Sequence, residues 1–355
     1  MTERRSRSFK GTELLRKLTG LLALLLASPV HAEAAEPAFS PDGEQVAPGV
    51  WLVPGGLRPD RQPDGNSVVF DAPAGLVVID TGRHAWHRRA ILSLARAQGR
   101  DIVAIVNTHW HLDHVSGNPD LRAAYPGLRV HASNAIDGAL AGFLAASAKD
   151  SAQYLGDPEI PESMREDIRA DMLTVENGAG LKPDVVIGGS GTMMIGGRHF
   201  GIHLAQDAVT AGDVWLYDEA SRVAVLGDLV TLPAPFLDTA CPGGWKNALT
   251  EVAATPFEVA IPGHGTPMTH AQVEQYRRAF GAFIECSSST RPAGECGVQW
   301  VGSVESLLVD AASDKPRAQG MVEYYVGMLR ANGGRSEYCR AGKEARSSEA
   351  QGKVG

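Results

Sequence analysis

The sequence lacks three features that would each decide its class. After residue 32 it has no apolar run of transmembrane length, no concentrated basic segment and no repeat of solenoid period. A membrane-spanning helix needs about 20 consecutive apolar residues, and nucleic-acid binding needs a concentrated basic face. The formal net charge of −8 also argues against nucleic acid as a main partner. With 355 residues and 44% hydrophobic content the chain can bury a sizeable core, so we expect a globular protein without a nucleic-acid partner.

Residues 1–32 are typical of a cleavable export signal. Six arginine and lysine residues come before the apolar stretch 18–27, and Val30, His31 and Ala32 fit a small-x-small cleavage site. An uncleaved membrane anchor is the alternative, but the apolar core is short for a membrane span. We therefore expect a periplasmic or secreted protein with no stable membrane insertion after cleavage.

The sequence has few cysteines, and none lies at metal-ligand spacing from the histidines. The four are Cys241, Cys286, Cys296 and Cys339, and four cysteines permit three disulfide connectivities. Export makes disulfides expected. Cys286 and Cys296 flank a loop rich in turn-forming residues, so they are the first choice for a pair, which leaves Cys241 with Cys339. Free buried thiols are the alternative.

The most informative segment that is present is an H-x-H-x-D-H motif directly after the apolar run 102–106. That run predicts a strand buried on both faces. The motif places four metal-capable side chains within six residues, in the order His109, His111, Asp113 and His114. A loop after a strand can turn two imidazoles one way and the carboxylate–imidazole pair the other, which predicts two adjacent metal positions. Zinc suits these ligands best, although manganese or iron would accept them; the alternative is a polar loop that happens to be rich in histidine.

Three further strands are predicted to end in residues of the same chemistry. The segment 75–82 is apolar and ends in Asp80 and a glycine turn, and the segment 222–228 repeats that design with Asp228 at its end. A third segment ends in His264, which stands between two glycines.

Taken together, these motifs resemble those of the metallo-β-lactamase-fold hydrolases, from about residue 49 to about residue 276. The resemblance implies an α/β fold, the four-layer αββα sandwich of that family. It implies that His109 and His111 bind a first metal, that Asp113, His114 and His264 bind a second, and that Asp228 bridges the two. It also implies that Asp80 orients ligands by hydrogen bonds from behind the metal loop; on general grounds Asp80 is otherwise an acid that caps a turn.

The sequence departs from the family pattern at Val209. The family has a third histidine for the first metal in an H-T-x-G-D segment, and here that segment begins with valine, which cannot bind metal. Asp207 is the preferred replacement because it lies two residues earlier, on the same face of an extended chain; His203 is the other candidate. An ordinary loop aspartate and a half-buried strand histidine are the alternatives. We expect one tightly bound Zn²⁺ and a second that is weaker.

The predicted organisation has five parts. Residues 1–32 form the signal, 33–45 a linker, 46–285 the metallo-β-lactamase-like domain, 286–340 a cysteine-containing C-terminal extension and 341–355 a disordered tail. Within the domain, 134–182 is a helical insertion with its best helices at 136–149 and 161–174, and it is either a lid over the metal cleft or a peripheral brace. A helix is also expected within 301–331. Phe236, which follows the predicted bridging acid, either lines the pocket or belongs to the core.

The expected activity is hydrolysis by a metal-bound hydroxide. A metal held by histidines and carboxylates lowers the pKa of its water from ~16 to about 7, and the resemblance gives Asp113 the roles of ligand and orienter of that water. An ester, lactone, amide or thioester bond in a small molecule is the expected target. β-Lactam hydrolysis is an alternative, although the true metallo-β-lactamases carry cysteine or serine where this chain has Asp228. A metal-binding accessory protein without turnover is another. The sequence does not indicate an oligomeric state.

The expected export signal leads to the first testable prediction. Protein recovered from a periplasmic fraction should begin near Glu33, because the signal is expected to be cleaved after Ala32. N-terminal sequencing checks this prediction, and soluble protein that begins at Met1 or Thr2 would contradict it.

Overall fold

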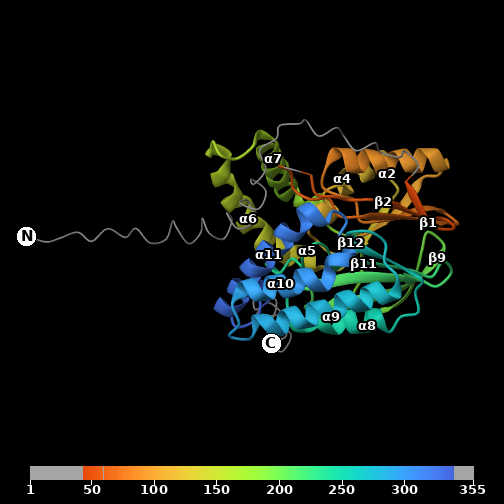
Figure 1. Cartoon of the computed structure of the whole chain (residues 1–355). Helices are drawn as coiled ribbons and strands as arrows, with labels where there is room; N and C mark the ends of the chain where they lie inside the picture. The colour runs from red at the N-terminus through yellow and green to blue at the C-terminus, as the bar shows by residue number, and fades with distance from the viewer. Residues whose placement is uncertain (1–42, 59, 340–355) are drawn as a thin grey trace, which may run out of the picture.

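The structure is a computed structural model that describes residues 43–58 and 60–339. The predicted signal, most of the predicted linker and the predicted tail lie outside these residues. Two sheets face one another, and helices cover the outer face of each, so that four layers follow in the order helix, sheet, sheet, helix (Figure 1). This is the predicted αββα sandwich.

The first sheet has seven strands in chain order. They are β1 (Glu44–Ala47), β2 (Val50–Val53), β3 (Ser67–Ala72), β4 (Gly75–Ile79), β5 (Ile102–Val106), β6 (Arg129–Ala132) and β7 (Val185–Val186). The strands β1 to β4 are antiparallel neighbours, whereas β4 to β7 run parallel. The boundary between linker and domain was predicted too late, because Glu44 and Gln45 already pair with β2. Both residues are polar and exposed, as on an edge strand, so they do not show the buried pattern by which a strand is recognised.

The second sheet has five strands in the order β12-β11-β10-β9-β8. They are β8 (Gly191–Ile195), β9 (Arg198–Gln206), β10 (Gly212–Asp218), β11 (Val223–Thr231) and β12 (Val259–His264). Only β11 and β12 pair in parallel. All nine residues of β11 are buried, because this strand lies between the other sheet and the outer helices.

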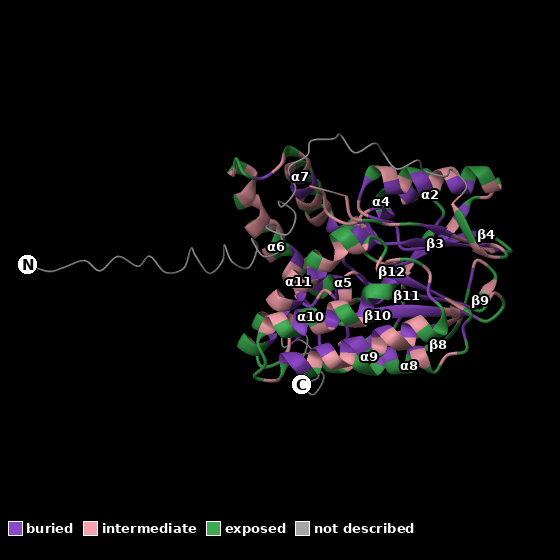
Figure 2. Cartoon of the chain, viewed as in Figure 1, coloured by how far each residue is buried: buried purple, intermediate pink, exposed green. Residues whose placement is uncertain are grey.

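Three buried clusters hold the layers together. Between the sheets, Phe70 of β3 packs edge-on against Phe200 of β9, with ring centroids 5.1 Å apart. The outer face of the first sheet is covered by α2 (Ala85–Gln98) and α4 (Asn118–Ala124). The second sheet is covered by α8 (Pro242–Ala253), α9 (His270–Ser287), α10 (Ala293–Val304) and α11 (Ala311–Ala331). In Figure 2 the buried colour runs along the facing strands and the inward sides of these helices.

The helical insertion forms, but its first helix is interrupted. The predicted span 136–149 is two helices, α5 (Ala135–Ala141) and α6 (Phe143–Ser151), because Gly142 leaves the helical conformation between them. The second predicted span corresponds to α7 (Glu162–Glu176). Short 3₁₀ turns η1 (Ala152–Gly156) and η2 (Gly178–Leu181) flank α7.

The C-terminal extension is also interrupted where continuous helix was expected. α10 ends at Val304, a 3₁₀ turn η3 (Glu305–Leu307) follows, and α11 starts after Asp310. The Asp310 side chain accepts a hydrogen bond from the amide of Ala312 and so caps α11. No helix among the described residues has both the length and the apolar character needed to cross a membrane.

Both predicted disulfides are present. Cys286 pairs with Cys296 and Cys241 pairs with Cys339, and no described cysteine is free. The first bond joins α9 to α10. The second ties the end of the extension to the residue that precedes α8.

A buried ion pair joins the two sheets at the end away from the metal loop. Arg198 donates to both oxygens of Asp218, at 2.8 and 2.6 Å, and to the carbonyl oxygen of Asp71 in the first sheet at 2.7 Å. The Asp218 side chain is fully buried. Replacing Arg198 by Ala should lower the free energy of unfolding by about 3–5 kcal/mol, because it leaves a buried carboxylate unpaired.

Urea unfolding measures this loss, and Arg169→Ala is the matched control. Arg169 pairs with Glu162 on the surface, with side chains 49% and 58% exposed, so its loss should leave the unfolding midpoint almost unchanged. Equal midpoints for the two variants would show that the buried pair does not stabilise the fold.

Candidate metal centre

The six predicted ligands come from three strands that meet at one edge of the sandwich. His109, His111, Asp113 and His114 lie in the loop after β5 and in the short helix α3 (Leu112–Val115). Asp228 projects from β11 and His264 ends β12. The structure therefore brings all six side chains together, and their nitrogen and oxygen atoms fall into two adjacent groups.

The first group contains three potential ligand atoms. His109 Nε2 lies 2.9 Å from His111 Nδ1. Asp228 Oδ2 lies 3.6 Å from His109 Nε2 and 3.8 Å from His111 Nδ1. Three atoms at these separations can share one ion, and three protein ligands are typical of a catalytic zinc.

The second group contains four potential ligand atoms. His264 Nε2 lies 3.0 Å from Asp113 Oδ2 and 3.4 Å from His114 Nε2. The other oxygen of Asp228, Oδ1, lies 3.2 Å from His114 Nε2 and 3.5 Å from His264 Nε2. Asp228 thus turns one oxygen to each group, as a bridging ligand would.

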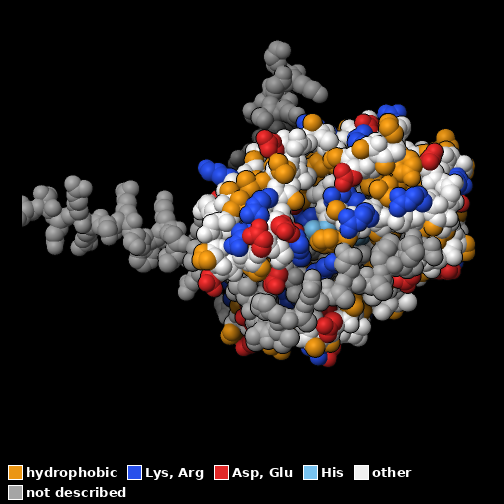
Figure 3. Space-filling view, turned by 90° about the horizontal axis from the view of Figure 1, so that it is seen from above, with side chains coloured by type: hydrophobic (Ala, Val, Ile, Leu, Met, Phe, Trp, Pro, Cys, Tyr) orange, Lys and Arg blue, Asp and Glu red, His pale blue; other side chains and the backbone are white. Residues whose placement is uncertain are grey.

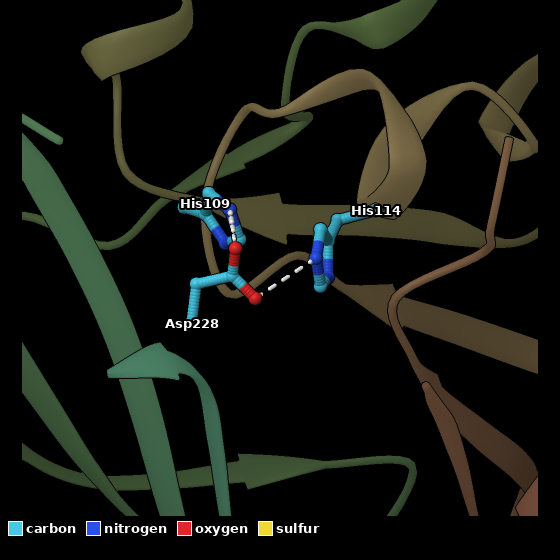
Figure 4. Close-up of side chains that lie close together, drawn as sticks. All are labelled: His109, His114 and Asp228. Atoms are coloured by element: carbon cyan, nitrogen blue, oxygen red, sulfur yellow. Dashed lines mark ion pairs between the residues drawn. The ribbon is translucent and has the colours of Figure 1, made fainter. Parts of the chain in front are cut away.

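The surroundings of Asp228 test whether a metal fits. Figure 4 shows its carboxylate between the rings of His109 and His114, which approach it from different sides. Asp228 Oδ1 is buried and makes no hydrogen bond of its own among the described residues. Its polar neighbours are His114 Nε2 at 3.2 Å and His264 Nε2 at 3.5 Å, which are themselves potential metal ligands. A Cβ at Gly263 would lie 2.0 Å from Asp228 Oδ1, so only glycine leaves room for this oxygen. A cation beside Asp228 would satisfy the unpaired atom, and we conclude that the donor set fits a divalent metal.

Asp80 fixes two of the histidines from behind, as expected for it. Its Oδ2 lies 2.8 Å from His114 Nδ1 and accepts the hydroxyl hydrogen of Thr108 at 2.7 Å. The Thr108 oxygen in turn lies 2.9 Å from His109 Nδ1. Because the carboxylate only accepts, both imidazoles place their N–H on Nδ1 and leave Nε2 for a metal.

The electrostatics of the cluster follow from burial and from the carboxylates. Burial and the neighbouring His109 lower the pKa of His111, which keeps its ring neutral. Burial also acts against the charged form of His114, but Asp228 and Asp113 outweigh it and raise the pKa of His114 well above its ordinary value. Without a metal, the carboxylates therefore draw positive charge into the site.

Of the two residues predicted to replace Val209, His203 does not do so. It stacks on Trp215 with ring centroids 3.7 Å apart, which is the half-buried strand histidine that was the alternative. Asp207 lies in the turn between β9 and β10, and its role as a ligand stays a prediction. Asp228 Oδ2 supplies a third atom to the first group.

The helical insertion reaches the metal loop through Arg83. This guanidinium lies 3.8 Å from Asp113 Oδ1 and forms an ion pair with Asp171 of α7. In the same helix Asp167 lies 2.7 Å from Arg61 and 3.2 Å from His84. The insertion thus braces the residue that stands beside Asp113.

Aromatic side chains flank the His111 side of the cluster. The ring of Phe236 lies edge-on to His111 with centroids 5.1 Å apart, and Trp110 does so at 4.8 Å. Phe143 of α6 packs against Trp110 at 5.6 Å. Phe236 is half-buried and touches both the core and a predicted ligand. Figure 3 shows histidine on the surface in the middle of one face, with apolar and basic side chains beside it.

Several residues of the site were missed by the sequence analysis. Thr108 stands directly before the motif, and this adjacency was a usable signal. Arg83 follows the turn after Asp80 but belongs to no motif. Thr239, whose hydroxyl lies 3.0 Å from His111 Nε2, comes from a loop that no pattern in the sequence links to the histidines.

Comparisons with known proteins agree with this geometry. The sequence profile described as the metallo-beta-lactamase superfamily matches residues 61–284. A hydroxyacylglutathione hydrolase of Gloeobacter violaceus is 46% identical over 54 residues, which are 15% of this chain and 21% of that protein. An atrochrysone carboxyl ACP thioesterase of Aspergillus fumigatus is 35% identical over 99 residues, which are 27% and 30% of the two chains. The match thus spans less than a third of the length of either relative.

Among solved structures, a metallo-beta-lactamase family protein of Thermus thermophilus superposes with a TM-score of 0.55 at 18% identity. The superposition covers 81% of this chain and 95% of that one. At this identity the likeness concerns the fold alone, and it supports the four-layer architecture.

Replacing Asp80 by Ala should weaken metal binding about 10- to 100-fold, because His114 and, through Thr108, His109 lose the group that orients them. Equilibrium titration with Zn²⁺ against a chelator measures the change. Asp120→Ala is a suitable control, since Asp120 is an exposed acid that pairs with Arg88 and not with a histidine. Equal affinities for the two variants would show that Asp80 does not orient the ligands.

Proposed function

The chain belongs to the metallo-beta-lactamase superfamily, and from that premise we propose that it is an exported, zinc-dependent hydrolase of an ester, lactone or amide-type bond in a small molecule. The observation that carries the proposal is the Asp228 carboxylate, which has one oxygen near His109 and His111 and the other near His114 and His264. An ordinary cluster of buried polar residues does not need one carboxylate turned to two separate sets of imidazoles.

The chain's own residues would hold two metals unequally. His109, His111 and Asp228 would hold the first, whereas Asp113, His114 and His264 together with Asp228 would hold the second. Bound zinc supplies a hydroxide at neutral pH and polarises the bond to be cleaved. Four ligands against three support one tightly bound metal and a weaker second one, and manganese or iron is compatible with the same donors.

Asp113 has the geometry for a second role beside that of ligand. Its Oδ2 belongs to the second group, while its Oδ1 lies toward Arg83. We assign to Asp113 the orientation of the attacking water and the acceptance of its proton. Burial acts against the charged form of Asp113, but His114, His264 and, to a smaller extent, Arg83 outweigh it and hold the pKa of Asp113 below its ordinary value, which favours the charged, accepting carboxylate.

The class of substrate rests on weaker support than the reaction type. The two curated relatives are named a hydroxyacylglutathione hydrolase and an atrochrysone carboxyl ACP thioesterase, and the second name supports keeping a thioester among the bonds to be tested. β-Lactam hydrolysis is the alternative within the same chemistry, and a metal-binding accessory protein without turnover is the alternative outside it. The half-buried ring of Phe236 beside His111 favours a substrate with an apolar part.

The proposal of export gains support from the cysteines. All four are paired, and disulfides persist mainly in oxidising compartments such as the periplasm.

Replacing Asp113 by Ala should reduce hydrolysis about 10²- to 10⁴-fold, because both the proton acceptor and a ligand of the second metal are lost. The test uses the reporter substrate that wild-type protein turns over best in a screen of ester, lactone, thioester and β-lactam compounds. Asp120→Ala is the matched control and should retain wild-type activity, since Asp120 is exposed and pairs with Arg88.

An Asp113→Ala protein that is folded and turns over at the wild-type rate would overturn the mechanism. If wild-type protein binds zinc tightly and cleaves none of the compounds in the screen, the accessory role without turnover takes the place of the proposed hydrolase.

A further inference from the structure

A chain of two hydrogen bonds connects the position of the family's missing histidine to His111. The side chain of Val209 is fully buried in the core of the second sheet, but its carbonyl oxygen accepts the hydroxyl hydrogen of Thr239 at 2.8 Å. The Thr239 oxygen lies 3.0 Å from His111 Nε2. Thr239 and His111 are both buried, so no bulk water competes for these bonds.

These bonds favour one tautomer of His111. The carbonyl of Val209 can only accept, so the hydroxyl of Thr239 donates its single hydrogen there. The Thr239 oxygen is left to accept, which favours a His111 ring with its N–H on Nε2. The lone pair of Nδ1 then faces the first ligand group, where His109 Nε2 lies 2.9 Å away and also presents a lone pair, because His109 carries its proton on Nδ1. In metal-free protein His109 therefore competes with Thr239 for the His111 proton, whereas a metal between the two nitrogens satisfies both.

Thr239 is held in place by the C-terminal extension. On one side of it, Asp238 accepts a hydrogen bond from the Tyr325 hydroxyl of α11 at 2.9 Å, and its carbonyl oxygen accepts one from Ser336. On the other side, the carbonyl of Ala240 accepts a hydrogen bond from the Ser336 amide at 3.2 Å. The next residue, Cys241, forms the disulfide with Cys339.

With a further bond from the Tyr324 hydroxyl to Asp238 at 3.4 Å, the segment 238–241 is tied to the extension by four hydrogen bonds and one covalent bond. A second attachment lies on the sheet side, where the Cys241 amide donates to the carbonyl of Ala208 at 2.8 Å. These contacts hold the Thr239 hydroxyl between Val209 and His111.

From these contacts we infer that Thr239 is a positioning residue for the first metal, and that the Cys241–Cys339 disulfide secures it. Thr239 favours the tautomer of His111 that the first ligand group needs, and it is held by the carbonyl of Val209, the position where the family has a third histidine. The disulfide couples the affinity of the first metal to the oxidation state of the C-terminal extension. This inference rests on the proposed metal function, but its first part is measurable in metal-free protein.

The tautomer is tested by nitrogen NMR of metal-free, ¹⁵N-labelled protein. The signal of His111 is assigned by its loss in a His111→Gln variant. Wild type and Thr239→Ser, which keeps the hydroxyl, should show a larger fraction of His111 with its proton on Nε2 than Thr239→Val. Thr239→Val, which has the same shape without the hydroxyl, should show the proton on Nδ1 in a large fraction of molecules.

The same variants are then titrated with Zn²⁺ against a chelator. Thr239→Val should weaken the weaker of the two binding constants by about 10- to 100-fold and leave the tighter one unchanged, and Thr239→Ser should restore it. An unchanged tautomer in folded Thr239→Val, or a loss that falls on the tighter constant, would overturn the assignment of Thr239.

The chain offers a matched control for the disulfide. Cys286–Cys296 joins α9 to α10, and neither of its cysteines forms a hydrogen bond with the segment 238–241 among the described residues. Cys286→Ser/Cys296→Ser should therefore keep both zinc constants, whereas Cys241→Ser/Cys339→Ser should weaken the weaker constant at least about tenfold. Equal losses in the two double variants, or no loss in either, would overturn the coupling.

If Cys241→Ser/Cys339→Ser fails to fold, reversible reduction replaces it. In the Cys286→Ser/Cys296→Ser background the remaining disulfide is reduced, the reductant is removed, and zinc is titrated before and after reoxidation. The weaker constant should fall on reduction and recover on reoxidation; a constant unaffected by this cycle would contradict the coupling. If wild type binds no zinc at all, the proposed metal function fails, while the NMR result on Thr239 stands by itself.

Discussion

The carboxylate of Asp228, buried between two sets of imidazoles, is the constraint on which the rest of the site depends. A buried charge is tolerated only where opposite charge or donors compensate it, and Asp228 Oδ1 makes no hydrogen bond of its own among the described residues. The sheets place Asp228 Oδ1 3.2 Å from His114 Nε2 and Asp228 Oδ2 3.6 Å from His109 Nε2. The parallel pair β11–β12 and the glycine at position 263 make that approach possible, so the fold itself builds a place for cations.

On each side of Asp228, hydrogen bonds from behind orient the imidazole rings that face it. Asp80 sets His114 directly and His109 through Thr108. On the opposite side, the carbonyl of Val209 and the hydroxyl of Thr239 set His111. In each case an acceptor that cannot donate favours one position for the imidazole proton, which leaves the other nitrogen free for a metal.

Local pattern was sufficient to predict the strand before the H-x-H-x-D-H motif and the Cys286–Cys296 pair, which left Cys241 with Cys339. The sandwich and the convergence of the six residues were predicted from the family resemblance, and both are present. The sequence was not sufficient where long-range packing decides. Thr239 lies 128 residues from His111 in the chain, and no periodicity encodes that contact. Asp207 was predicted from its distance along the chain, whereas the third atom of the first group belongs to Asp228 on β11.

Anomalous diffraction at the zinc edge, on crystals of the wild-type protein grown with zinc, tests the central claim most directly. The account predicts two anomalous peaks, one on each side of the Asp228 carboxylate. The peak among Asp113, His114 and His264 should keep the higher occupancy when zinc is withdrawn from the crystals. A single peak that Asp228 does not touch, or two peaks elsewhere in the molecule, would contradict the shared carboxylate as the centre of this site.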